Sequence, residues 1–122
     1  MISSERGSKE ALACARKALE EHDRFWLGNV PKMEAEFYEL GLLTEEERYM
    51  AIDIALIEIV PGDRKGPVAP HDRASHGPFF GEKLYAFKWQ SQQLKKLMYL
   101  KFALPSDPPP EKLAVYSFHE TE

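Results

Sequence analysis

The sequence has one cysteine, Cys14, among its 122 residues. A single thiol cannot form an internal disulfide, and it cannot supply the several cysteines that structural zinc sites commonly use. Glycine is also sparse, and the spacing around Gly62 and Gly66 fits neither the Walker pattern nor the dinucleotide-binding pattern. These absences argue against a disulfide scaffold, a cysteine metal centre and a glycine-rich phosphate loop.

Long apolar runs are absent as well. No stretch approaches the ~18 apolar residues that a membrane span requires. The first ten residues, MISSERGSKE, contain no apolar segment of the kind found in secretory signals. We therefore expect a cytoplasmic protein that does not engage a membrane. At 122 residues the chain is long enough for one domain with a real core and too short for two.

The charges are unevenly distributed, although the net charge is only −4. The first 62 residues carry seven Lys and Arg against thirteen Asp and Glu, whereas the last 60 carry nine against seven. Five lysines and one acid fall between Glu82 and Leu104. Such a basic segment can attract a phosphate backbone, but lysines also protect exposed sheet edges from aggregation. Charge alone favours lysines that protect sheet edges over lysines that bind phosphates.

Residues 1–60 predict an acidic, helical half of the domain. A first helix follows Ser8 as its N-cap, and a second runs from about Pro31 to Leu40 with Gly41 just past its end. The second helix carries an acidic side, for which a solvated face is the simplest interpretation: Glu34, Glu36 and Glu39.

A third helix is predicted from Thr44 to about Ile59. Thr44 and Glu47 have the spacing of a capping box, in which each side chain accepts a hydrogen bond from the other residue's backbone. The helix is apolar on more than one side, so we expect it to be the most buried helix, packed against a sheet.

Residues 61–80 are rich in proline, glycine and histidine, and we interpret them as a long loop. The loop carries several donors suited to an anionic ligand, namely Arg64, Lys65, His71, Arg73 and His76. A metal site built from His71, Asp72 and His76 is conceivable, but no cysteine or acidic pair supports it. We therefore predict no metal.

Residues 81–122 predict the sheet. Three apolar segments have the composition of strands: Leu84 to Trp89, Leu94 to Leu104 and Leu113 to Glu120. In the middle segment Met98, Leu100 and Phe102 fall on one face, while Tyr99 and Lys101 fall on the other. We expect an α+β fold in which the N-terminal helices pack on a small, mostly antiparallel sheet of three or more strands. The three apolar side chains should be buried against the Thr44-capped helix.

Several of these segments together resemble a known family. They are ALIEIVPGDRK, the strand holding Trp89 and Gln90, MYLKFAL and the terminal VYSFHE. Over roughly residues 55–120 the chain is similar to the MqsR-type messenger-RNA interferases, which are toxins of bacterial toxin–antitoxin pairs with a RelE-like α+β fold. The resemblance implies an endoribonuclease that needs no metal or cofactor, with RNA as substrate and a protein antitoxin as partner.

The resemblance also implies a set of functional residues. The catalytic candidates are His119, Tyr99, Lys65 and Lys101, and the candidates for RNA binding are Arg64, Gln90, Lys88 and Arg73. In this chemistry the ribose 2′-OH attacks the adjacent phosphate, which requires a base, cations for the developing charge and an acid for the leaving oxygen. His119 suits either proton-transfer role, because an unperturbed imidazole titrates near ~6.5.

A different class of function fits the sequence too. The acidic helices could engage a basic protein partner, so that the protein would act as a non-enzymatic adaptor or inhibitor and the sheet lysines would only aid solubility. The acidic residues concerned are Glu34, Glu36, Glu39 and Glu45 to Glu47.

Overall fold

The computed structural model describes residues 8–21, 24–26, 30–68, 84–104 and 112–121. Three helices come first: α1 (Ser8–Glu20), α2 (Val30–Glu39) and α3 (Glu45–Glu58). The strands are β1 (Arg24–Trp26), β2 (Arg64–Val68), β3 (Leu84–Ser91), β4 (Lys96–Ala103) and β5 (Leu113–Glu120), with a short 3-10 turn at Pro61–Asp63. The predicted α+β class is confirmed.

The three predicted strands form the centre of one sheet, whose order is β1-β5-β4-β3-β2. β4 pairs antiparallel with both β3 and β5. The predicted alternation holds along β4, since Met98, Leu100 and Phe102 are each fully buried. They share one core with Ile52 and Leu56 of the Thr44-capped helix, as expected.

Two further strands were not foreseen. β1 is a three-residue strand that pairs parallel with β5 inside the half expected to be wholly helical. β2 lies within the segment interpreted as a loop and pairs antiparallel with β3. Its register shifts between Lys65 and Val68, where Gly66 and Pro67 stand. Because β2 is an edge strand, a proline without an N–H can be accommodated there.

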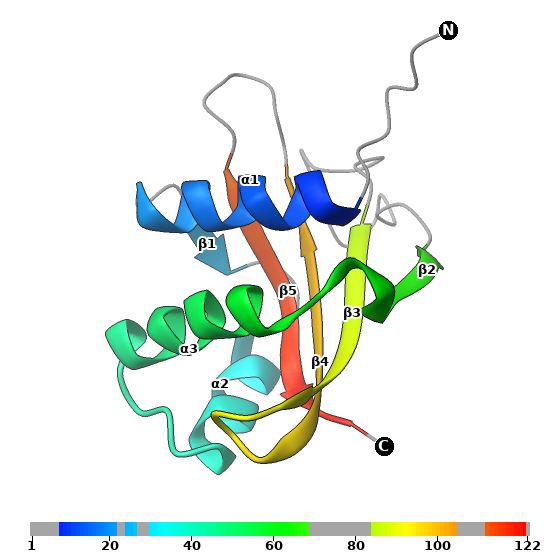
Figure 1. The fold of residues 1–122 in the computed structure, drawn as a ribbon. Helices are drawn as coiled ribbons and strands as arrows, with labels where there is room; N and C mark the ends of the chain where they lie inside the picture. The colour runs from blue at the N-terminus through cyan, green and yellow to red at the C-terminus, as the bar shows by residue number, and fades with distance from the viewer. Residues whose placement is uncertain (1–7, 22–23, 27–29, 69–83, 105–111, 122) are drawn as a thin grey trace, which may run out of the picture.

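All three helices cover the same face of the sheet (Figure 1). α2 packs on β5 through Phe37 and Phe118, whose ring centroids lie 6.0 Å apart. β1 contributes Trp26, which stacks on Tyr49 of α3 with 4.3 Å between ring centroids. An aromatic layer therefore joins the helices to the sheet.

The ends of α2 and α3 follow the sequence signals. Gly41 has a φ of +80°, the left-handed conformation expected just past a helix end. At the start of α3, Thr44 Oγ1 accepts a bond from the Glu47 N–H, and Glu47 Oε1 accepts one from the Thr44 N–H. The predicted capping box is thus present.

The sheet covers α3 on one side only, although the helix is apolar on more than one side. Tyr49, Ile52, Ala55 and Leu56 are buried, but Met50 and Ile57 are more than half exposed on the opposite side. An apolar pattern on two sides of a helix cannot tell which side the sheet will cover, and here the sheet covers only one.

Glu58, at the C-terminal end of α3, binds the turn between β3 and β4. Its Oε1 accepts bonds from Trp89 Nε1 at 3.0 Å and Ser91 Oγ at 2.9 Å. Its Oε2 accepts bonds from the backbone N–H groups of Gln92 at 2.8 Å and Gln93 at 3.0 Å. A carboxylate at a helix C-terminus is unfavourable by itself, so these four donors explain its presence.

These bonds also set the pKa of Glu58. Desolvation by burial favours the neutral form, but the four donors outweigh it and hold the pKa below its ordinary value of 4.5. A carboxylate whose pKa is lower in the folded state contributes stability above its unfolded pKa. That contribution is lost as the pH falls through the folded pKa.

We predict that Glu58→Gln lowers the free energy of unfolding by about 1–3 kcal/mol at neutral pH, because an amide replaces a charged acceptor that serves four donors. The difference from the wild-type protein should shrink as the pH falls below 4.5, since the wild-type carboxylate then becomes neutral as well. Urea unfolding between about pH 3 and pH 7 measures both effects. Glu34→Gln, at an exposed carboxylate of α2, is the control; a difference from wild type that stays constant with pH would contradict the role of Glu58.

Candidate functional site

The face of the sheet opposite the helices carries the candidate site. Because side chains alternate along a strand, the residues between the buried ones on β3, β4 and β5 point to this side. We call it the outer face, and among the described residues no helix covers it. It brings together five of the eight predicted site residues: Lys88, Gln90, Tyr99, Lys101 and His119.

Tyr99 occupies the middle of this group. It is directly opposite His119 on β5 and Lys88 on β3, so the three residues form a row across the central strands. The rings of Tyr99 and His119 lie 5.4 Å apart between centroids, tilted by 35°. Burial raises the pKa of Tyr99, so its hydroxyl stays protonated at neutral pH and can donate a hydrogen bond.

His119 is held in a defined orientation. Its Nδ1 lies 2.8 Å from the backbone carbonyl oxygen of Glu120, which can only accept. Nδ1 must therefore carry the proton in the neutral imidazole, which leaves the Nε2 lone pair available. A histidine with an available Nε2 can accept a proton from a bound hydroxyl.

Lys101 lies two residues after Tyr99 on β4 and points to the same face. It pairs with Ser117, and its Nζ lies 5.7 Å from the ring centroid of Tyr116. The register between β4 and β5 shifts by one residue at this point, so Tyr116 and Ser117 share one position opposite β4. The resulting bulge places a second aromatic ring beside the ammonium group of Lys101.

The other predicted residues are placed differently. Lys65 pairs with Ala86, which pairs with Lys101, so Lys65 stands in the same row of the sheet as Lys101. Arg64 does not join the group, since its guanidinium lies over the ring of Tyr85 in the core on the helix side, 4.8 Å from the centroid. Arg73 lies outside the described residues.

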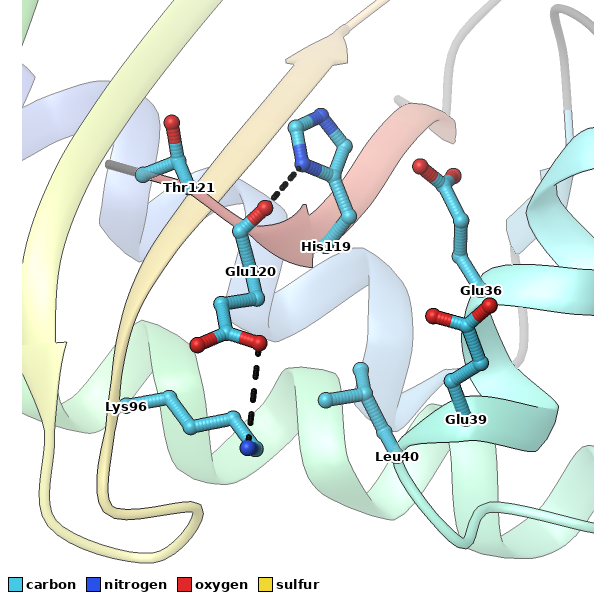
Figure 2. Close-up of a pocket in the computed structure, with 7 residues that line it drawn as sticks. All are labelled: Glu36, Glu39, Leu40, Lys96, His119, Glu120 and Thr121. Carbon is cyan, nitrogen blue, oxygen red and sulfur yellow. Dashed lines mark hydrogen bonds and ion pairs between the residues drawn. The ribbon is translucent and has the colours of Figure 1, made fainter.

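A hollow of about 420 Å³ opens beside His119 at the C-terminal end of β5 (Figure 2). β5 pairs with β1 only from Leu113 to Val115, so further along it has α2 as its neighbour. His119 lies on one side of the hollow and two carboxylates of α2 on the other. The lining residues are Glu36, Glu39, Leu40, Lys96, His119, Glu120 and Thr121.

Glu36 and Glu39 were missed as site residues. Their sequence pattern indicated a solvated acidic face or a surface for a basic partner, and nothing local in the sequence reveals that α2 lies beside the end of β5. Within the hollow Lys96 Nζ and Glu120 Oε1 form an ion pair at 3.7 Å. The hollow is therefore mainly acidic, whereas the outer face is basic. His119 lies where the two meet.

Neither a metal site nor a membrane span is found in the described part of the chain. No group of three or more His, Cys, Asp and Glu side chains there could hold a metal ion. The conceivable site at His71, Asp72 and His76 lies outside the described residues. None of the helices that the structure describes is long and apolar enough to cross a bilayer.

Comparisons with protein-family models, curated proteins and solved structures found no match.

We predict that neutral His119 carries its proton on Nδ1, because the Glu120 carbonyl accepts from that atom. Nitrogen-15 NMR of the neutral imidazole should show Nε2 as the unprotonated nitrogen. A proton on Nε2 would contradict the orientation described here and would remove the available lone pair. Tyr99→Phe, which keeps the ring beside His119, should leave this tautomer unchanged.

Proposed function

We propose that the outer face binds single-stranded RNA and that His119 promotes its cleavage without a metal. The observation that carries this proposal is the contact between the Tyr99 and His119 rings, 5.4 Å apart on the outer face, which no described helix covers. Aromatic rings on an exposed sheet are surfaces on which unpaired bases stack, and neighbouring lysines attract the phosphates between those bases.

The charges favour one path for the RNA. Lys88 and Lys101 flank Tyr99 on the outer face, whereas the carboxylates of Glu36, Glu39 and Glu120 line the hollow below it. Phosphates are attracted to the lysine side and repelled from the hollow. The strand would therefore run over β3 and β4 and present one phosphate to His119.

The proposed chemistry uses few groups. His119 Nε2 takes the proton of a ribose 2′-OH, and the 2′ oxygen attacks the adjacent phosphorus. Lys101 stabilises the charge that develops on the phosphate oxygens, and the protonated Tyr99 hydroxyl can donate a hydrogen bond to them. The bond from phosphorus to the 5′ oxygen breaks, and that oxygen takes a proton from solvent on this open face. The products are a 2′,3′-cyclic phosphate and a 5′-hydroxyl.

This activity matches what the resemblance to the interferase toxins implies. On that basis the protein would be the ribonuclease of a bacterial toxin–antitoxin pair, and a companion protein would hold it inactive. Induced expression alone should then arrest growth, and His119→Ala should relieve the arrest. Harmless expression of the wild-type protein would instead favour the adaptor alternative.

We predict that the purified protein cleaves single-stranded RNA in the presence of EDTA and that His119→Ala slows cleavage by about 100-fold or more, the usual range for general-base catalysis. Lys101→Ala should slow it by about tenfold, as expected for the loss of one charge contact to the phosphate. The measurement is the rate of appearance of 2′,3′-cyclic phosphate ends on a mixed-sequence RNA pool.

Lys17→Ala is the matched control for Lys101→Ala, because it removes one exposed lysine from α1 on the other side of the sheet. It should leave the rate within a factor of about two, since distant surface charges are screened by salt. Circular dichroism must show that the variants remain folded. Unchanged cleavage by folded His119→Ala, or cleavage abolished by EDTA, would overturn the proposed chemistry.

A further inference from the structure

The exposed side of α3 is apolar over about two turns. Met50 and Ile57 are 58% and 57% exposed, and Ile54 between them is half-buried. Their spacing of four and then three residues places them on one side of a helix. We call these three residues the α3 stripe. Leu43 and Val60, just beyond the ends of α3, are also more than half exposed.

Such a stripe is unusual on an otherwise well-buried helix. The opposite side of α3 already supplies the core through Tyr49, Ile52, Ala55 and Leu56. The exposed apolar side chains therefore add nothing to that core, and their contact with water is unfavourable. A contiguous apolar patch of this kind marks a surface that another molecule covers.

The charges around the stripe indicate the chemistry of that molecule. Helical geometry places Glu46 and Asp53 along one edge of the stripe and Glu47 along the other. Glu58 does not belong to this border, because its carboxylate binds the β3–β4 turn. The one basic residue of α3, Arg48, is turned away: its guanidinium lies over the Phe37 ring, 5.1 Å from the centroid, and its Nε donates to the Leu42 carbonyl. The stripe is therefore apolar with an acidic border.

One end of the stripe adjoins a hollow of about 350 Å³ between α1 and α3. Leu19, Tyr49 and Met50 supply its apolar lining. Its polar lining contains three acids and two bases, namely Glu20, Glu46, Asp53, Arg16 and Arg24. Arg24 is engaged inside the fold, because its Nη1 donates to the Leu19 carbonyl and its guanidinium lies over the Tyr49 ring. The hollow is therefore lined by apolar and charged side chains together.

We propose that the α3 stripe binds an amphipathic helix of a partner protein, whose apolar side chains are bordered by lysine or arginine. α3 has 14 residues and so spans about 21 Å, which matches about four turns of such a helix. A second copy of this chain fits poorly, because two α3 stripes would bring their acidic borders together. This docking surface lies on the helix side of the molecule, away from the outer face, and does not depend on the proposed RNA site.

The test uses two designed, fluorescein-labelled helical peptides of about 18 residues, long enough for a helix of five turns. Both carry leucines at helical spacing; one has lysines along the borders and the other has glutamates at the same positions. Fluorescence anisotropy should show that the lysine peptide binds with a Kd below about 100 μM and that salt weakens the binding. The glutamate peptide should bind at least tenfold more weakly.

Variants of the protein then locate the binding. The double substitution Met50→Ser and Ile57→Ser should weaken binding of the lysine peptide at least tenfold, because the apolar contact is lost. Glu46→Gln with Asp53→Asn should weaken it several-fold and reduce the salt dependence. Tyr38→Ser, at an exposed aromatic of α2 that lies outside the stripe, is the control and should change nothing.

Several results would overturn the proposal. These are equal binding of the two peptides, no binding of the lysine peptide, or unchanged binding by the folded Met50→Ser, Ile57→Ser variant. A wild-type dimer in sedimentation analysis that the same two substitutions dissociate would show that a second copy occupies the stripe instead.

Discussion

The bonds between Glu58 and the β3–β4 turn connect the helical half of the protein to its sheet. One carboxylate accepts bonds from Trp89, Ser91 and two backbone N–H groups, and Ser91 in turn accepts a bond from the Leu94 N–H. Without this acceptor the donors would lie at the helix–sheet junction unpaired, which is costly. The bonds fix the β3–β4 hairpin against α3, and β4 is the strand that carries both the buried Met98 and the functional candidate Tyr99.

This attachment leaves the protein with two chemically different surfaces. The helices cover the inner face of the sheet. The outer face carries a row of aromatic and basic side chains centred on Tyr99. The far side of α3 keeps an apolar stripe with acidic borders. A nucleic acid and a basic helical partner require opposite charges. The two surfaces lie on opposite sides of the sheet, so the two proposed ligands would not compete for one surface.

Structural features that depend on residues close together in the sequence were predicted correctly. Alternation identified β3, β4 and β5, and local signals identified the Thr44 capping box and the turn at Gly41. The mostly antiparallel arrangement of these three strands was also predicted correctly. β1 and β2 were missed, as was the position of Glu36 and Glu39 beside His119. The Tyr99–His119 contact depends on the pairing of β4 with β5. The exposed side of α3 escaped prediction because periodicity does not reveal which apolar side finds a partner.

The most direct test of the central claim is an NMR titration with single-stranded 2′-O-methyl RNA, in which the attacking hydroxyl is blocked and the strand stays intact. The account predicts that the largest amide shifts map to the outer face, at Lys88, Tyr99, Lys101, Ser117 and His119, and that they weaken with added salt. Shifts confined to the helix side of the molecule, or no shifts at millimolar RNA, would contradict it.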